Sequence, residues 1–345
     1  GDNMTIPIYA PFAGTITRVI EEIHEEDISI VNKRVEITSS ENNNYTAVIF
    51  HLNLHDAYPQ IFNDHPSIHS FAGSSNIQNL QSTNLSEWPA ADGCIVDLYC
   101  YDVSFYEALR KKYKQIIIFD DFEFQVPHSV SAVINGNICT QSTQYPAHLQ
   151  TFTGIKYFLM RTEFIGKRQS INAQNVLVCM GGSDPENQTT RLLEILSKLT
   201  ARSIDAVFGP GFEDKAVIQK WSTHPQITTH CAVSNMSDLM KNAAFCVSGA
   251  GSMMYEFAYM GVPIACMSLI GHQRLIAEAF SKEKAAIYLG YFDEITDFQI
   301  ASQLQILDKD EQTRSKLGQM AQTLVDGKGS QRLASDLRNW LTRGC

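Results

Sequence analysis

Short apolar runs alternate with amphipathic stretches along most of this chain. The alternation is most regular over residues 174–290, where runs of consecutive apolar residues are typical of strands covered on both faces. Strands are predicted at residues 176–180, 203–208, 227–230, 245–247 and 264–267, and helices at residues 187–196, 238–243 and 253–260. Strands that alternate with helices indicate a mainly parallel sheet with crossover connections. A helical stretch at residues 310–340 is expected to pack against the sheets.

The first half of the chain has a less uniform pattern. Strands are predicted at residues 94–99, 115–121 and 133–135, and a helix at residues 103–112. Residues 1–93 instead contain β-branched, partly alternating segments between turn residues, which predict mostly strands. Residues 67–87, rich in Ser, Asn and Gln, are predicted to form a long loop. The pattern therefore divides the chain into residues 1–93, 94–165 and 170–345.

Composition and charge exclude several classes of protein. The 345 residues suffice for two domains, each with its own core. With 27 Lys and Arg against 37 Asp and Glu, the formal net charge is −10, which argues against a nucleic-acid-binding protein. The 8 cysteines contain no pair at the spacing of zinc or redox motifs, so reduced thiols and a cytoplasmic location are expected. No apolar run has the length of a membrane span, and no signal-peptide pattern is found at the N-terminus.

Two glycine-rich turns each follow an apolar strand-like run and each open a helix-like stretch. The first is Gly181-Gly182-Ser183-Asp184-Pro185, and the second is Ser248-Gly249-Ala250-Gly251-Ser252. Glycine lets the backbone approach an anion closely, and a helix start supplies unpaired N–H groups and a positive dipole end. Both turns lie at the carboxyl ends of predicted strands, the edge where open α/β sheets bind ligands. The pair predicts a phosphate site, with ligand-free strand-to-helix corners as the alternative.

From about Gly93 to the C-terminus, the order and spacing of several motifs resemble those of two-domain nucleotide-sugar enzymes with the GT-B fold. The motifs are Asp97-Leu98-Tyr99, Phe119-Asp120-Asp121 and residues 181–189, 233–236, 249–256, 261–263 and 271–273. The likeness is to the UDP-2,4-diacetamido-2,4,6-trideoxy-β-L-altropyranose hydrolases of pseudaminic acid biosynthesis and, more distantly, to MurG-type N-acetylglucosaminyltransferases. It implies an α/β fold of two Rossmann-like domains with a cleft between them, here with an atypical, β-rich N-terminal part. Residues 94–165 would complete the N-terminal domain, and residues 170–345 would form the nucleotide-binding domain with the terminal helices.

The resemblance also implies roles for individual residues. Glu256 would accept hydrogen bonds from both ribose hydroxyls, the Ser252 hydroxyl would add a donor to the diphosphate, and residues 233–236 would meet the uracil. The implied nucleotide-binding set is Gly181, Gly182, Ser183, Val233, Ser234, Asn235, Met236, Ser248, Gly249, Ala250, Gly251, Ser252 and Glu256, and the implied sugar contacts are Asn187 and Gln273. The hydrolase family works without a metal, so neither a metal nor another cofactor is expected. The reaction then needs a base for water and stabilisation of the leaving diphosphate.

Three features depart from the family's pattern. The family's Gly-x-Gly-His-x-x-Arg loop, which carries the catalytic base, has no counterpart in this chain. The family's Asp-His-Tyr motif corresponds to Asp97-Leu98-Tyr99, which lacks the histidine. The family's Asn-Gln pair corresponds to His272-Gln273. Tyr99 and His272 are therefore the catalytic candidates, and His272 lies in a predicted loop where an imidazole could act as acid or base. The alternatives are a tyrosine packed at a strand end and an ordinary loop histidine. Asp120-Asp121 is expected to cap a helix or solvate a strand end rather than to act in catalysis.

The leading functional hypothesis is a UDP-sugar hydrolase in surface-glycan or nonulosonic-acid biosynthesis, with a UDP-sugar or UDP as its partner. A GT-B glycosyltransferase with a UDP-sugar donor is the first alternative, and it would need an acceptor pocket. A non-catalytic nucleotide-sugar-binding protein is the second, because the Gly-x-Gly-His loop is missing. The sequence leaves the sugar, the acceptor and the oligomeric state open.

A further alternative places the activity in the N-terminal part. Residues 10–19 resemble the opening of biotinyl- or lipoyl-type barrel-sandwich modules and of lysostaphin-like peptidase modules. His51-Leu52-Asn53 lacks the second histidine of such peptidases, so solvated histidines are preferred to a zinc site. Residues 1–93 then either begin the N-terminal domain in a divergent form or form a separate β-rich module.

Overall fold

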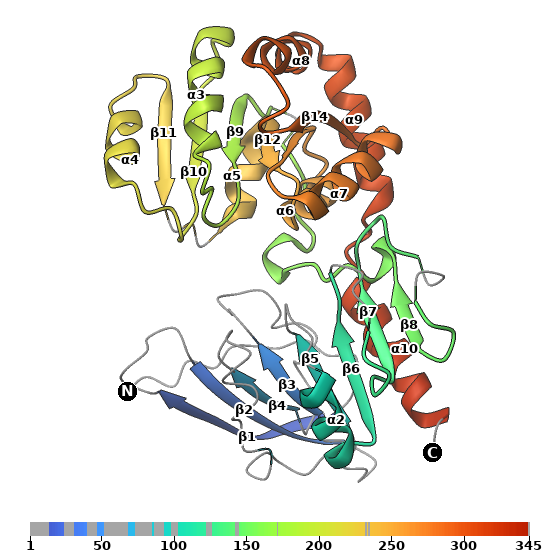
Figure 1. Ribbon diagram of the computed structural model, residues 1–345. Helices are drawn as coiled ribbons and strands as arrows, with labels where there is room; N and C mark the ends of the chain where they lie inside the picture. Colours follow the sequence, from blue (N-terminus) through green and yellow to red (C-terminus); the bar gives the residue numbers. More distant parts are fainter. Residues whose placement is uncertain are drawn as a thin grey trace. The chain divides into compact units, whose positions relative to one another are not determined.

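The chain folds into two compact α/β units. The computed structural model describes residues 14–23, 31–39, 47–51, 68–72, 85, 93–97, 103–121, 126–141, 145–170, 172–231, 233 and 235–343. Unit 1 consists of Gly1–Arg161 and Lys328–Cys345, and unit 2 of Thr162–Gly327 (Figure 1). Among the described residues, each unit contains one β-sheet.

Unit 2 contains a six-stranded parallel sheet with the strand order β11-β10-β9-β12-β13-β14. The strands are β9 (Asn175–Cys179), β10 (Ile204–Phe208), β11 (Ile227–Cys231), β12 (Ala243–Gly249), β13 (Ile264–Ser268) and β14 (Ala286–Tyr291). The helices are α3 (Gln188–Leu199), α4 (Lys215–Ser222), α5 (Met236–Asn242), α6 (Met253–Met260), α7 (Gly271–Lys282), α8 (Asp297–Lys309) and α9 (Glu311–Leu324). The five strands predicted in this segment are confirmed, and β14 is added to them.

The strand order of unit 2 reverses between β9 and β12. The chain runs outward from β9 through β10 to β11, returns to pair β12 with the other side of β9, and then continues to β13 and β14 (Figure 1). This is the doubly wound Rossmann order, in which ligands bind outside the carboxyl ends of the strands at the point of reversal. Both glycine-rich turns follow the two strands that flank this point.

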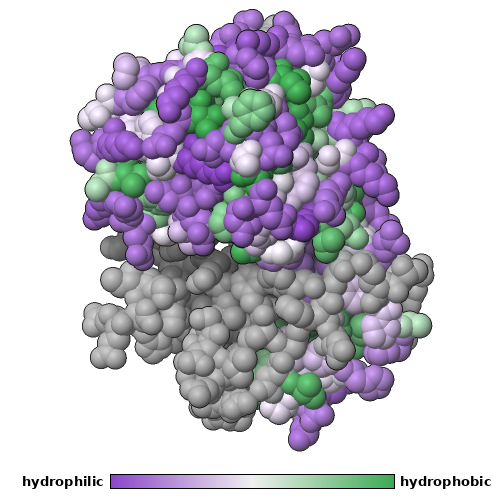
Figure 2. Space-filling model, turned by 45° about the horizontal axis from the view of Figure 1, so that its top comes forward, coloured by the Kyte–Doolittle hydropathy of each residue, from purple (hydrophilic) through white to green (hydrophobic). Residues whose placement is uncertain are grey.

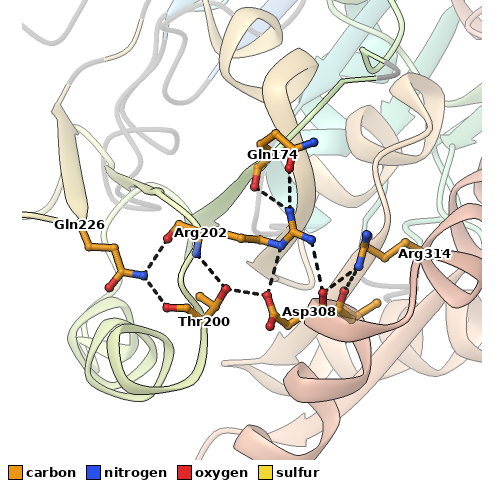
Figure 3. A network of polar contacts seen from close by, with 7 residues as sticks. Gln174, Thr200, Arg202, Gln226, Asp308 and Arg314 are labelled. Carbon is orange, nitrogen blue, oxygen red and sulfur yellow. Dashed lines mark hydrogen bonds and ion pairs between the residues drawn. The ribbon is translucent and has the colours of Figure 1, made fainter.

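A polar network holds the opposite, amino-terminal edge of the same sheet (Figure 3). The Arg202 guanidinium lies 3.1 Å from the Asp308 carboxylate, and the Thr200 hydroxyl donates to the same carboxylate at 2.5 Å. Arg202 also donates to the carbonyl of Gln174, and Gln226 Nε2 donates to the carbonyls of Thr200 and Arg202 at 2.7 Å each. These residues precede β9, β10 and β11 and end α8, so the network joins the strand starts to the helical layer and leaves the carboxyl edge to other contacts.

Unit 1 contains an eight-stranded sheet with the order β1-β2-β4-β3-β5-β6-β7-β8. The strands are β1 (Gly14–Ile23), β2 (Val31–Ser39), β3 (Ala47–His51), β4 (Ile68–Ala72), β5 (Gly93–Asp97), β6 (Gln115–Phe119), β7 (Ala132–Asn135) and β8 (Gln150–Thr153). β2 is antiparallel to both β1 and β4, and the remaining pairs, from β4 through β3, β5, β6 and β7 to β8, are parallel.

The N-terminal strands belong to the same sheet as the strands after Gly93. β3 pairs with β5 in parallel from Ala47 opposite Gly93 to His51 opposite Asp97. This pairing joins the described strands before and after Gly93 in one sheet. The predicted long loop at residues 67–87 is wrong at Ile68–Ala72, which forms β4 by pairing with β2 and β3.

Two helices cover the two faces of the unit 1 sheet. Helix α2 (Val103–Lys112) buries Phe105, Tyr106 and Leu109 with the strand residues of one face. Helix α10 (Gly329–Arg343) lies beside β7 and β8 (Figure 1). It buries Leu333 and Leu337 against the other face, which includes Ile95, Ile117 and Phe152. The sequence analysis assigned the terminal helices to residues 170–345. Helices α8 and α9 lie in unit 2, whereas α10 lies in unit 1 because its apolar face completes that core.

The described surface is mostly hydrophilic, with hydrophobic residues in separate patches on the face that Figure 2 shows. The exposed large hydrophobic residues include Phe298, Leu275 and Ile270, which lie on or beside helices α8 and α7. No helix within the part of the chain that the structure describes is both long and apolar enough to cross a membrane.

We expect Leu333→Ala to destabilise unit 1 by about 2–5 kcal/mol, because it removes a fully buried side chain and leaves a cavity between α10 and the sheet. Urea unfolding measures this loss. Gln331→Ala, an exposed change on the same helix, is the control. Equal stability of the two variants would contradict the assignment of α10 to this core.

Candidate functional site

The two glycine-rich turns lie side by side at the carboxyl edge of the unit 2 sheet. β12 pairs with β9 in parallel register, with Ser248 opposite Cys179. A Cβ added at Gly249 would lie 3.2 Å from the carbonyl oxygen of Met180, and the sulfur atoms of Cys179 and Met253 are 3.5 Å apart. The two glycine-rich turns are therefore in contact where they begin.

The first turn is held from the side by the loop that follows β10. Gly181 has φ +102°, a conformation that favours glycine. A Cβ at Gly209 would lie 2.4 Å from the carbonyl oxygen of Gly181 and 2.3 Å from that of Gly182. The Gly211 N–H donates to the Gly182 carbonyl at 2.8 Å. Only a glycine at position 209 lets these two loops approach so closely, whereas Gly182 faces open space.

An aspartate of the first turn caps the following helix. The Asp184 carboxylate is buried and accepts the N–H groups of Gln188 at 2.9 Å and Thr189 at 2.8 Å. These are N–H groups of the first turn of α3, so the chain's own carboxylate occupies the position that an anion would take there. Asp184 and Asn187 both have positive φ values, +41° and +48°. The Asn187 Oδ1 atom is buried and has no hydrogen-bond partner among the described residues.

The second turn offers fewer donors than its sequence suggests. Ser248 is buried, and its hydroxyl donates to the Gly249 carbonyl at 3.0 Å. The Ala250 N–H donates to the Met267 carbonyl, and the Gly251 N–H to the Gly249 carbonyl, both at 2.9 Å. Within the described residues, the N–H groups of Ser252 and Met253 make no backbone hydrogen bond. These two groups, at the positive end of α6, are the donors that the turn presents.

Glu256 and Gln273 flank this helix start. Glu256 lies one turn into α6, as predicted from the sequence, and it is buried, with 4% of its surface exposed to solvent. Gln273 Oε1 accepts the Leu269 N–H at 2.9 Å, and its Nε2 approaches Gly251, where a Cβ would lie 4.0 Å away. The first turn of α7 therefore brings an amide side chain to the second glycine-rich turn.

His272 lies in a helix, not in the predicted loop. It belongs to the first turn of α7, which begins at Gly271. Burial lowers the pKa of His272 below its usual value of 6.5, so its imidazole is mainly uncharged at neutral pH. An uncharged imidazole can accept a proton.

Residues 233–236 connect β11 to α5. Asn235 Oδ1 accepts the Ser237 hydroxyl at 2.6 Å and Lys167 Nζ at 3.4 Å, and its Nδ2 donates to Asp238 at 2.7 Å. Met236 is buried and Val233 half-buried. Side chains of this segment are thus engaged within the protein. Ser234, like the catalytic candidate Tyr99, lies outside the described residues.

Unit 1 places acidic side chains at the carboxyl ends of β5 and β6. Burial and the nearby Asp121 carboxylate raise the pKa of Asp97 to about 7. Asp120 is buried and accepts the Tyr145 hydroxyl at 2.9 Å, while Tyr145 also accepts Asn135 Nδ2 at 3.0 Å. Asp120 therefore belongs to a packed polar network, whereas the sequence analysis expected it to cap a helix or solvate a strand end. The sequence analysis quoted Asp97 only as a motif residue, because a raised pKa depends on neighbours that sequence alone does not place.

Residues 176–334 match the glycosyltransferase family 28 C-terminal domain, and this match includes both glycine-rich turns, Glu256 and Gln273. Three curated proteins are similar to this chain. Protein MJ1062 of Methanocaldococcus jannaschii is 28% identical over 61% of this chain and 48% of its own length. Spore coat polysaccharide biosynthesis protein SpsG of Bacillus subtilis is 25% identical over 71% of this chain and 77% of its own length.

The third relative is the pseudaminic acid cytidylyltransferase and UDP-2,4-diacetamido-2,4,6-trideoxy-beta-L-altropyranose hydrolase of Helicobacter pylori. It is 24% identical over 59% of this chain and 39% of its own length. The match thus spans less than half of the Helicobacter protein and about half of the Methanocaldococcus protein.

Solved structures show the fold. MurG of Acinetobacter baumannii matches with a TM-score of 0.57 and 14% identity over 79% of this chain and 85% of its own. UGT2 of Phytolacca americana, solved with UDP-2fluoro-glucose and pterostilbene, matches with a TM-score of 0.57 and 11% identity over 86% of this chain and 93% of its own. The chain therefore has the GT-B fold that the sequence motifs predicted.

Gly209→Ala should destabilise the protein by about 1–3 kcal/mol, because the new methyl group would overlap two carbonyl oxygens of the first turn. Gly182→Ala is the matched control, since nothing lies within 4 Å of its Cβ position. Thermal and urea unfolding compare the two. A Gly209→Ala protein as stable as Gly182→Ala would show that the two loops are not in contact.

Asp97→Asn should stabilise the protein above pH 7 by roughly 1–4 kcal/mol, because the folded state holds the proton of this carboxyl up to a pKa of about 7 and the unfolded state loses it near 3.8. The gain should shrink as the pH falls from 7 towards 3.8, where both states bind the proton. Urea unfolding across this range measures it, with the exposed Asp293→Asn as control. A gain that does not depend on pH would contradict the raised pKa.

Proposed function

We propose that this chain, with its match to the glycosyltransferase family 28 C-terminal domain, binds a UDP-sugar and hydrolyses it to UDP and free sugar. The activity would belong to surface-glycan or nonulosonic-acid biosynthesis. Support comes from the names of two relatives, a UDP-sugar hydrolase of pseudaminic acid biosynthesis and a spore coat polysaccharide biosynthesis protein. A structural neighbour was solved with a fluorinated UDP-glucose.

The observation that carries the proposal is the meeting of the two glycine-rich turns at the strand reversal of unit 2. The diphosphate would bind the N–H groups of Ser252 and Met253 at the positive end of α6, and the Ser252 hydroxyl would add a donor. Gly181 and Gly182 would form the opposing backbone wall. No side chain at position 182 limits the approach of a ligand.

The nucleoside and the sugar would extend from this diphosphate position. The carboxylate of Glu256, one turn into α6, would accept the two ribose hydroxyls, and residues 233–236 would meet the base through backbone groups. Gln273 and Asn187 would contact the sugar. The Asn187 amide supports this role because its oxygen has no partner among the described residues, and buried polar atoms are usually hydrogen-bonded.

In the proposed reaction, the oxygen of water bonds to the anomeric carbon, the bond from that carbon to the diphosphate oxygen breaks, and UDP leaves with the electron pair. A base takes the proton of the water. His272 is one candidate, because burial favours its uncharged form. Tyr99 remains the other candidate from the sequence. The helix start would stabilise the charge on the departing diphosphate.

A glycosyltransferase is the second candidate function, because residues 176–334 match a glycosyltransferase domain and the fold is shared with MurG. The hydroxyl of an acceptor would then replace water. A nucleotide-sugar-binding protein without activity would bind the same ligand and release nothing.

The deciding experiment is a screen of UDP-, CMP-, GDP- and dTDP-linked sugars by thermal shift and by release of the nucleotide. A ligand that binds the folded state raises the melting temperature by mass action, even without turnover. UDP release without an acceptor supports a hydrolase, and release only with an acceptor supports a transferase. Stabilisation without release supports a binding protein. If no UDP-sugar shifts the melting temperature, the proposal fails.

Glu256→Ala should weaken UDP binding at least about tenfold, because it removes a charged acceptor of two hydroxyl hydrogen bonds. Isothermal titration calorimetry measures the affinity, and a thermal melt checks that the variant is folded. The matched control is Glu186→Ala, which removes an exposed carboxylate from the first turn and should leave the affinity nearly unchanged. A folded Glu256→Ala protein that binds UDP as tightly as the wild type would overturn this ribose contact.

A further inference from the structure

Two proline-led turns in unit 1 present histidines at the amino edge of its sheet. In the first turn the Val130 N–H donates to the Pro127 carbonyl at 3.0 Å, and in the second the Leu149 N–H donates to the Pro146 carbonyl at 3.0 Å. The first turn carries His128 and leads to β7, and the second carries His148 and leads to β8. Because β7 and β8 are parallel neighbours, the two turns lie together.

The two imidazoles, both on exposed residues, lie beside each other at a solvent-open cavity. Their ring centroids are 4.7 Å apart with an angle of 57° between the ring planes. The cavity has a volume of about 450 Å³. Its described lining consists of Arg110, Gln115, His128, Ser129, Val130, Ser131, Ala147, His148, Leu149, Gln150 and Trp340. All of these residues belong to unit 1.

The described lining residues are rich in hydrogen-bond donors, and none of them carries a side-chain carboxylate. Arg110 Nη1, from the last turn of α2, donates to the Lys114 carbonyl and to the Ser131 hydroxyl at 3.3 Å. The Ser131 hydroxyl also accepts the Ile116 N–H at 3.2 Å, which fixes it in place. The Ser129 Oγ atom is buried and has no hydrogen-bond partner among the described residues. A guanidinium, two imidazoles and two hydroxyls therefore line one cavity, and no acidic side chain accompanies them among its described lining residues.

This donor set matches a phosphate group better than a cation or a neutral ligand. Phosphate presents several acceptor oxygens, and a guanidinium can bind two of them at once. A cation would be repelled by Arg110. The volume is within the range of small-molecule sites, about 300–1,000 Å³, and exceeds what inorganic phosphate alone would fill. Trp340 and the imidazoles supply ring faces for the organic part of a ligand.

We propose that this cavity of unit 1 binds a small phosphomonoester, with its phosphate on Arg110 and the two histidines and its organic part against Trp340. The cavity lies at the amino ends of β6, β7 and β8, and the proposed nucleotide site belongs to the carboxyl edge of unit 2. The proposal is therefore independent of the proposed function.

Isothermal titration calorimetry of the full-length chain with glucose 6-phosphate tests the proposal, with inorganic phosphate and glucose as reference ligands. Saturating UDP in the buffer keeps the proposed nucleotide site occupied. We expect saturable binding of glucose 6-phosphate, weaker binding of inorganic phosphate and none of glucose. Arg110→Gln and His148→Gln should each weaken the binding at least about tenfold, since each removes a donor to a charged group.

Lys111→Gln is the matched control, because it removes an exposed positive charge from the same helix turn and should leave the affinity unchanged. Two variants at the cavity keep the test valid if one of them fails to fold. The proposal is overturned by the absence of saturable binding, by equal losses in Lys111→Gln, or by full affinity in folded Arg110→Gln and His148→Gln proteins. Equal affinities for inorganic phosphate and glucose 6-phosphate would overturn recognition of the organic part.

Discussion

The parallel pairing of β12 with β9 is the constraint on which the candidate site depends. Ser248 lies opposite Cys179, so the two strands end at the same height and their glycine-rich turns begin next to each other. The close approach of Gly249 to the Met180 carbonyl leaves no room for a side chain between them without a shift. The strand reversal therefore presents a surface made of backbone atoms. Its hydrogen-bond donors are backbone N–H groups and not basic side chains. This is consistent with a chain whose formal net charge is −10.

The two turns differ in how many backbone N–H groups they leave available for an anion. At the first turn, the Asp184 carboxylate already satisfies two N–H groups of α3, so this helix start is neutralised within the protein. At the second turn, the N–H groups of Ala250 and Gly251 bond to carbonyls, and the amides of Ser252 and Met253 remain at the start of α6. We infer that an anion would bind at the start of α6. The first turn, which packs closely against Gly209, would form the opposite backbone surface of the site. The sequence predicted one phosphate site from the pair of turns and did not distinguish the contribution of each turn.

Local patterns predicted much of the fold. The strands β9 to β13 were predicted because their apolar runs are continuous, and the match to the GT-B fold followed from motif order. β14 was not predicted, although residues 285–289 form a short apolar run. His272 was expected in a loop, but it follows Gly271, which is the first residue of α7. The pattern of α10 shows an apolar face but not that Leu333 packs on strands more than 170 positions away, such as β7. The raised pKa of Asp97 depends likewise on Asp121, from another strand end.

The most direct test of the central claim is a crystal structure of the protein with bound UDP. The account predicts a diphosphate within hydrogen-bond distance of the Ser252 and Met253 amides, with the ribose on Glu256. Retention of the bond between Asp184 and the start of α3 is part of the same prediction. UDP bound elsewhere, or a diphosphate that displaces Asp184 to occupy the start of α3, would contradict it.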